Sequence, residues 1–179
     1  MLEIEKKYRI SPDRLIEIVT SLNEIGAVFV GEDFEENTIY GGDALERTGG
    51  IVRIRRTQDR AVLTFKRRVG NQADVKQQVE YETEISDSHA AARILAELDL
   101  SPKLIYEKRR KTWTLKSTEV VLDELPFGLF MEIEGSITAI REAEMLLGID
   151  DLETEHETYP RLTAALGTRT GDIIEARFS

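Results

Sequence analysis

The chain has 179 residues, of which 41% are hydrophobic and 32% charged, and we expect residues 1–179 to form one soluble globular domain. Its 24 Lys and Arg against 34 Asp and Glu give a formal net charge of −10, which argues against a general binder of nucleic acid or anionic membranes. With no cysteine and only two histidines, disulfides, thiolate metal sites, a cysteine nucleophile and histidine metal clusters are excluded.

The first predicted elements are a strand and a helix. Residues 2–10 alternate apolar and charged side chains, with Lys6 as the exception, and this period of two predicts a strand. Ser11 and Pro12 are typical of a helix start, and apolar residues follow at helical spacing until Gly26 ends the pattern. The glycine pairs at 41–42 and 49–50 indicate turns.

The middle of the chain carries four predicted strands whose charged residues share one face. A helix that begins at residues 86–88 is predicted between the third and the fourth of these strands. Basic residues occupy one face of three of these strands, and glutamates occupy one face of another. In chain order, the charged residues on these faces are Arg53 and Arg55 on the first strand, Lys66 on the second, Glu80, Glu82 and Glu84 on the third, and Lys108 and Arg110 on the fourth.

The last third adds two acidic strands and two helices. Asp123 ends an apolar strand, and Glu132 and Glu134 alternate with apolar residues on the next one. Ser136 predicts the start of a helix that stops at Gly148, and residues 159–166 predict a short helix, whereas residues 168–179 give no firm signal. The pattern predicts an α+β domain of roughly eight strands in a mostly antiparallel sheet with helices packed against it.

The charged strand faces have two interpretations. They point either to water or to the inside of a closed or nearly closed barrel whose apolar exterior is covered by helices. Confined like charges repel by about 4 kcal/mol at ~4 Å and an effective dielectric near ~20, so such an interior needs a guest of compensating charge. Arg and Lys suit a polyanion and carboxylates suit a hard divalent cation, so a metal-bound polyphosphate would satisfy both.

These motifs resemble those of the CYTH superfamily, the triphosphate tunnel metalloenzymes, which includes class IV adenylyl cyclases, thiamine triphosphatases and inorganic tripolyphosphatases. The segment EIEKK at residues 3–7 fits the E-x-E-x-K signature of that superfamily. The match continues in chain order through Arg53 and Arg55, LTFK ending at Lys66, the acidic strand, Lys108 and Arg110, and LDELPFGLFMEIEG at 122–135, and ETYPRL at 157–162 is similar to the closing helix.

The resemblance implies an eight-stranded antiparallel closed or nearly closed β-barrel with helices outside and a triphosphate within. It assigns phosphate binding to Lys7, Arg53, Arg55, Lys66, Lys108 and Arg110, and one or two Mg²⁺ or Mn²⁺ ions to Glu3, Glu5, Glu82, Asp123, Glu132 and Glu134. It implies a catalytic set of Glu5, Glu132, Glu134 and Lys66. Within the acidic strand we favour Glu82, and because Val79 stands where relatives often carry a basic residue, Lys76 or Arg68 could substitute.

Three functions remain open on the sequence alone. Hydrolysis of a small nucleoside, organic or inorganic triphosphate is favoured because attacking water makes fewer demands than a positioned nucleoside. The alternatives are a class IV adenylyl cyclase, which forms cyclic AMP and pyrophosphate, and a non-catalytic binder of triphosphate or polyphosphate. No apolar run reaches the ~20 residues of a membrane helix and no signal peptide is visible, so we expect a cytoplasmic protein without nucleic-acid or membrane partners, with a homodimer left open.

Overall fold

The computed structural model describes residues 2–72 and 75–179, and among them the side chains of residues 4–67 and 78–179. The strands are β1 (Leu2–Ile10), β2 (Val28–Gly41), β3 (Gly50–Arg56), β4 (Ala61–Gln72), β5 (Val75–Ile85), β6 (Ser101–Leu115), β7 (Thr118–Leu125), β8 (Gly128–Glu134), β9 (Thr168–Thr170) and β10 (Ile173–Ala176). The helices are α1 (Pro12–Glu24), α2 (Asp43–Thr48), α3 (Ser88–Glu97), α4 (Ile137–Leu147) and α5 (Tyr159–Leu166).

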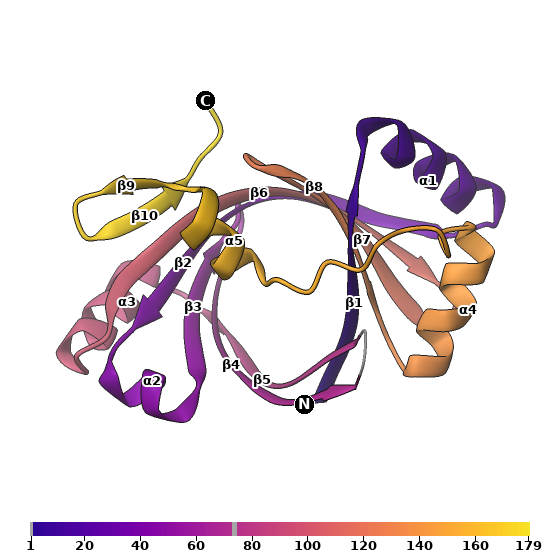
Figure 1. Ribbon diagram of the computed structural model, residues 1–179. Coiled ribbons are helices and arrows are strands. Elements are labelled where there is room, and N and C mark those ends of the chain that lie inside the picture. Colours follow the sequence, from indigo (N-terminus) through magenta and orange to yellow (C-terminus); the bar gives the residue numbers. More distant parts are fainter. Residues whose placement is uncertain (1, 73–74) are drawn as a thin grey trace.

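Eight of these strands form a nearly closed antiparallel barrel (Figure 1). Ladders join them in the order β2-β3-β4-β5-β1-β8-β7-β6, and β6 pairs in turn with β2. The shortest ladders of the ring are those between β1 and β5, which pair only from Leu2 to Glu5, and between β2 and β3, where β2 pairs only from Glu36 to Tyr40. The predicted fold, a closed or nearly closed eight-stranded barrel with helices outside, is confirmed.

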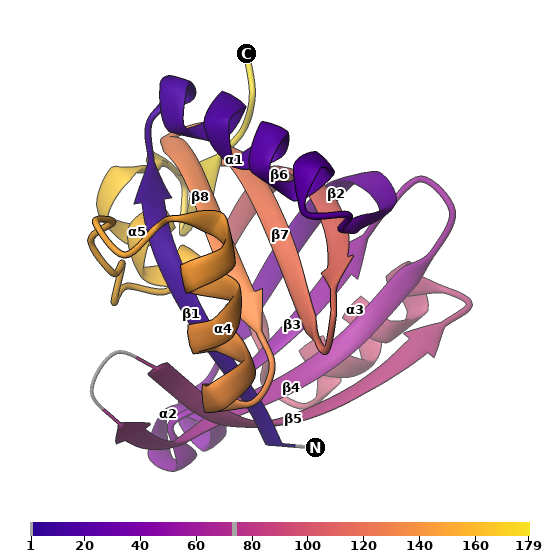
Figure 2. The ribbon, with the colours of Figure 1, turned by 90° about the vertical axis from the view of Figure 1, so that its right-hand side faces the viewer.

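Much of the outer face of the barrel is apolar and is covered by helices. Tyr8 of β1 and Met131 and Ile133 of β8 are buried against α1 and α4, whose apolar stripes include Leu22 and Ile140. Figure 2 shows α4 lying along β1, β8 and β7, with α1 across the end of the same strands. Each large apolar side chain buried in this way contributes about 1.5–3 kcal/mol to folding, so the helix layer fixes which face of each strand points inward.

The predicted helix starts agree with the caps of the structure. Ser11 Oγ and Ser136 Oγ accept hydrogen bonds from the first turns of α1 and α4, and Gly148 adopts the left-handed conformation that ends α4. Among the described helices, none has the length and the apolar character that a membrane crossing requires.

Three segments differ from the sequence-based prediction. β2 was not predicted because it lacks alternation: Val28–Val30 are exposed on both faces, whereas Asn37–Tyr40 are buried on both faces. The glycine pairs do flank turns, but the short helix α2 lies between them. Residues 168–179, which gave no signal, contain β9 and β10, and β10 extends the sheet by pairing parallel to β6 at Leu104–Tyr106.

One opening of the barrel is crossed by the chain that links α4 to α5 (Figure 1). This segment is fastened to β1, because Thr154 forms an isolated bridge with Tyr8 and the Glu155 amide donates to the Lys7 carbonyl at 2.8 Å. Thr158 then caps α5, so that Tyr159, the first residue of the helix, points into the barrel.

Candidate active site

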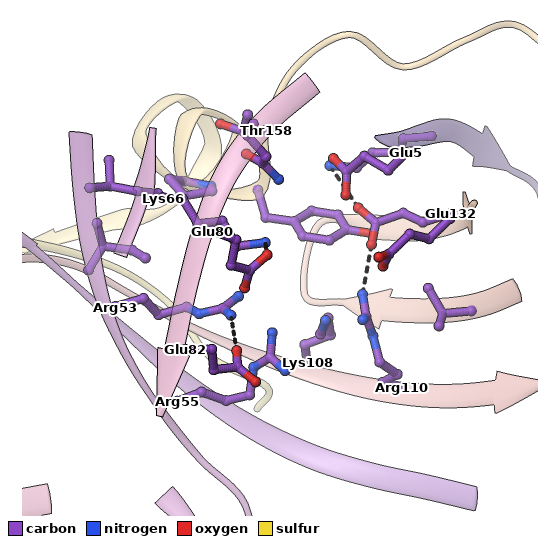
Figure 3. A pocket seen from close by; sticks show the side chains of 18 of the residues that line it. Glu5, Arg53, Arg55, Lys66, Glu80, Glu82, Lys108, Arg110, Glu132 and Thr158 are labelled. Atoms are coloured by element: carbon purple, nitrogen blue, oxygen red, sulfur yellow. Dashed lines mark hydrogen bonds and ion pairs between the residues drawn. The ribbon is translucent and has the colours of Figure 1, made fainter. Parts of the chain in front are cut away.

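The barrel encloses a cavity of about 650 Å³ that is lined mainly by charged side chains (Figure 3). All eight strands of the ring contribute to its wall, and the start of α5 closes part of it. The lining residues predicted from the sequence are Glu5, Lys7, Arg53, Arg55, Lys66, Glu82, Lys108, Arg110, Glu132 and Glu134. Glu3, Arg68 and Lys76 lie outside the side chains that the structure describes.

Six cations, which we call the basic bank, surround this cavity: Lys7, Arg53, Arg55, Lys66, Lys108 and Arg110. Lys7 and Lys108 are each only 2% exposed, an unusual degree of burial for lysine. The Nε atoms of Arg53 and Arg55 are buried and have no hydrogen-bond acceptor among the described residues. Buried donors without acceptors are costly, so the basic bank fits an anion with several oxygen atoms.

Three carboxylates lie side by side on the wall formed by β1, β8 and β7, and we call them the carboxylate row. Glu134 of β8 is the register partner of Glu5 on β1 and of Glu119 on β7. Burial, and after it the carboxylates of Glu119 and Glu5, raise the pKa of Glu134 above its usual value. Like charges directly opposite in a sheet destabilise it, and a divalent cation is the guest that would relieve this repulsion.

The donor set fits a cation that shares its ligands with a substrate. No three carboxylates among the described residues converge into a ready-made cation cage. Mg²⁺ commonly takes one or two carboxylates and completes its shell with water and phosphate oxygens, so the carboxylate row suits this mode of binding. Glu132, two residues before Glu134 on β8, is instead ion-paired to Arg110 at 2.7 Å and to Lys7 at 3.2 Å.

The acidic strand β5 supplies two glutamates to the cavity. Glu80 is ion-paired to Lys66 at 2.8 Å, which matches their register in the β4–β5 ladder. Glu82 accepts a hydrogen bond from the Thr64 hydroxyl at 3.0 Å and lies 3.7 Å from the guanidinium of Arg53. Of the three glutamates on this face of β5, Glu80 and Glu82 line the cavity, whereas Glu84 is not among the described lining residues.

Asp123 lies behind the cavity wall and is 1% exposed. Its carboxylate accepts two hydrogen bonds from Arg110, at 2.7 and 2.6 Å, and one from the Tyr159 hydroxyl at 2.8 Å. These contacts orient Arg110 toward the cavity. Asp123 was predicted as a metal ligand, but its position behind the cavity wall does not support that role.

Tyr159 forms an aromatic end wall of the cavity. The Lys7 ammonium lies 3.6 Å from the centre of its ring, and that of Lys108 lies 5.5 Å away. Burial, and after it the charge of Asp123, raise the pKa of Tyr159 well above its usual value, so its hydroxyl remains protonated and can donate to Asp123.

Three site residues were not predicted from the sequence. Glu119 has the same parity as Asp123 on β7, and extending that alternation back by four residues would have found it. Glu35 lies on the strand that lacked alternation, and nothing in the sequence marks it as inward-facing. Tyr159 belongs to the ETYPRL segment that the resemblance includes, but its side chain had no assigned role.

Comparisons with known proteins agree with the barrel fold. A family model described as the CYTH domain matches residues 1–159. A candidate adenylate cyclase of Methanocaldococcus jannaschii is 28% identical over 152 residues, which cover 82% of this chain and 84% of that protein.

Two solved structures show the same fold. The PH1012 protein of Pyrococcus horikoshii has a TM-score of 0.78 at 21% identity, over 89% of this chain and 98% of that one. A candidate adenylyl cyclase of Hippeastrum, described as having a dominant triphosphatase activity, has a TM-score of 0.69 at 19% identity, over 91% and 95% of the two chains.

Proposed function

This chain belongs to the CYTH domain family, whose members act on triphosphates, and we propose that it is a divalent-metal-dependent triphosphatase. The substrate would be a small triphosphate bound inside the barrel, with orthophosphate released from its end. Attack by water forms a new P–O bond at the terminal phosphorus, and the bridging P–O bond to the next phosphorus breaks.

One observation carries the proposal: the basic bank and the carboxylate row line the same cavity. The buried Nε atoms of Arg53 and Arg55 make no hydrogen bond to any described residue, although Arg55 Nε is ion-paired to Glu35 at 3.4 Å. Glu5, Glu119 and Glu134 bring three negative charges into adjacent register positions. An anion alone would leave the carboxylates repelling one another, and a cation alone would add positive charge to a cavity that already holds the basic bank. A metal-bound triphosphate compensates both sets of charges at once.

The residues of the chain would divide the work as follows. Arg53, Arg55 and Arg110 would hold phosphate oxygens through fixed guanidinium donors, and Lys7 and Lys66 would add compact positive charges. The carboxylates of Glu5 and Glu134, with Glu132 beside them, would hold Mg²⁺ or Mn²⁺. A cation bound there would neutralise charge that develops on the phosphate oxygens during transfer.

Adenylyl cyclase activity is the second candidate, and the relative from M. jannaschii described as a candidate cyclase supports it. In that reaction a ribose 3′-hydroxyl attacks the α-phosphorus, and pyrophosphate leaves. The same charged cavity would serve both reactions, so the products decide between them.

The deciding experiment incubates the full chain with tripolyphosphate, thiamine triphosphate or ATP in the presence of Mg²⁺ or Mn²⁺, and identifies products by ion chromatography. We expect orthophosphate from at least one substrate and none when EDTA is added. Cyclic AMP with pyrophosphate would replace the triphosphatase assignment with the cyclase. Binding without any turnover would overturn both in favour of a non-catalytic polyphosphate binder.

A further inference from the structure

A buried carboxylate lies behind the basic bank and belongs to none of the motifs discussed above. Glu35 of β2 has a side chain that is 3% exposed, and its register partner across the β2–β6 ladder is Lys108. Its Oε2 lies 3.1 Å from Lys108 Nζ and 3.4 Å from Arg55 Nε, and it accepts a hydrogen bond from Asn37 Nδ2 at 3.2 Å. One carboxylate therefore contacts two members of the basic bank.

Glu35 carries a permanent negative charge. Burial acts to raise its pKa, but Lys108, and after it Arg55, hold that pKa far below its usual value. Glu35 does not line the cavity, because Lys108 and Arg55 lie between it and the open space. A ligand in the cavity would consequently meet this charge as a fixed part of the wall.

The effect of such a charge depends on the ligand. Coulomb repulsion between Glu35 and an anion grows in proportion to the charge of the anion, and the low dielectric of the interior preserves it. Each additional phosphate group therefore adds a further penalty, while the number of cations in the basic bank stays the same. Asp123, the other carboxylate beside Lys108, differs because it also anchors Arg110 and Tyr159.

We propose that Glu35 is an internal counterion that limits the negative charge accepted by the cavity, and that it thereby sets a preference for triphosphate over longer linear polyphosphates. This inference rests on the proposed function, because it assumes that the basic bank binds a polyphosphate. Glu35 acts through Lys108 and Arg55 and is a positioning and specificity-determining residue, not a catalytic one.

The test measures binding of pyrophosphate, tripolyphosphate and tetrapolyphosphate by isothermal titration calorimetry in EDTA, so that no turnover occurs. Glu35→Gln should tighten binding by about sixfold, tenfold and fifteenfold in that order, because the gain in binding free energy is proportional to the charge of the ligand. The matched control is Glu36→Gln, which removes the same charge from the next residue of β2. Glu36 lies on the outer face, paired at 2.8 Å to both Arg56 and Arg177, so its loss should leave the ratios between the three ligands unchanged.

A second variant keeps the test decisive if Glu35→Gln does not fold. Asn37→Asp adds a carboxylate at a buried position beside Glu35, opposite Arg55 in the β2–β3 register, and should weaken binding most for tetrapolyphosphate. If folded Glu35→Gln shifts all three affinities by one common factor, or if Asn37→Asp shifts none, the inference is wrong while the proposed function stands. If the wild-type chain binds none of the three ligands either in EDTA or with Mg²⁺ added, the proposed function itself is wrong.

Discussion

Glu134 is the residue at which the charges of the cavity conflict most directly, because a carboxylate lies opposite it on each neighbouring strand. Glu134→Gln removes the middle charge of the carboxylate row, so we expect the metal-free protein to become more stable. A relief of about 0.5–1 kcal/mol corresponds to a rise in Tm of about 1–4 °C, measurable by circular dichroism. The same variant should lose the stabilisation that Mg²⁺ or Mn²⁺ gives the wild type, and adding Glu132→Gln should abolish metal-dependent turnover.

The matched control for this prediction is Glu124→Gln on β7. The Glu124 side chain is 46% exposed and pairs on the outer face with Arg109 at 3.3 Å, so its loss should change neither Tm nor the response to metal by much. Unchanged turnover in Glu132→Gln with Glu134→Gln would remove the carboxylates of β8 from the proposed metal site.

Arg53 tests the other half of the cavity. Its Nε has no hydrogen-bond acceptor among the described residues, and one of its terminal nitrogens, Nη2, donates to Thr64 at 3.2 Å. Arg53→Ala should weaken tripolyphosphate binding about 10–100-fold and make that binding less sensitive to salt, because one charge-assisted contact is lost. Calorimetry at two ionic strengths measures both effects. Arg56→Ala serves as the control, because Arg56 pairs on the outer face with Glu36 and Ser88. If both variants lose the same amount of tripolyphosphate affinity, Arg53 has a structural role and does not bind phosphate.

Individual site residues could be predicted from the sequence because charged and apolar side chains alternate along the strands. Ten of the charged residues predicted for the site line the cavity because alternation places them on the face opposite the helix-covered core. Asp123 shows the limit of that reasoning, since correct parity still left it behind Arg110. Glu35 could not be predicted in this way, because both faces of β2 are buried near its end and its sequence shows no alternation.

The elements were predictable where caps and amphipathic stripes were strong, and less so where pairing partners decide the structure. Ser11 and Ser136 mark the starts of α1 and α4 by their side-chain chemistry alone. β10 has only four residues, and it exists as a strand because Leu104–Tyr106 of β6 extends beyond the reach of β7. Such a strand depends on a tertiary partner and leaves little trace in local sequence.

The hairpin of β9 and β10 supports the end wall of the cavity. It follows α5 directly, packs α5 against β6 and is fastened by Arg177, which is bonded to Glu36 and Glu107 at 2.8 and 2.9 Å. Deleting residues 168–179 should leave the eight-stranded ring intact but lower Tm by several degrees and weaken tripolyphosphate binding, because Tyr159 loses its support. Melting curves and calorimetry test this. If Tm falls while affinity stays unchanged, α5 holds its position without the hairpin.

The barrel as a whole brings together charges that the sequence keeps apart. Residues 47–68 and 103–116 are mainly basic and residues 117–158 mainly acidic, so the net charge of −10 is a difference between separate blocks. Ring closure through the β2–β6 ladder places both kinds of block around one cavity. The sequence indicated the faces of the strands, but strand order comes from pairing over long separations, such as β1 with β8, that no local pattern encodes.

Lys108 shows a property that only the assembled barrel has. Burial, and after it the guanidinium of Arg110, lower its pKa from 10.5 to about 8, although Asp123 and Glu35 act in the opposite direction. Between these two values the unfolded chain binds more protons than the folded chain, so this residue makes the free protein more stable as pH rises from about 8 to 10.5. Polyphosphate binding should change in the opposite sense, because Lys108 loses the charge that attracts phosphate. We therefore expect metal-free tripolyphosphate affinity to fall above pH 8, by up to about tenfold per pH unit, while the contribution of Lys108 to Tm rises. Calorimetry and melting curves across that pH range test both trends, with Lys108→Met as the control that cannot titrate. This variant should bind tripolyphosphate more weakly at pH 7 and should show neither trend. If Lys108→Met keeps the trends, another group causes the pH dependence.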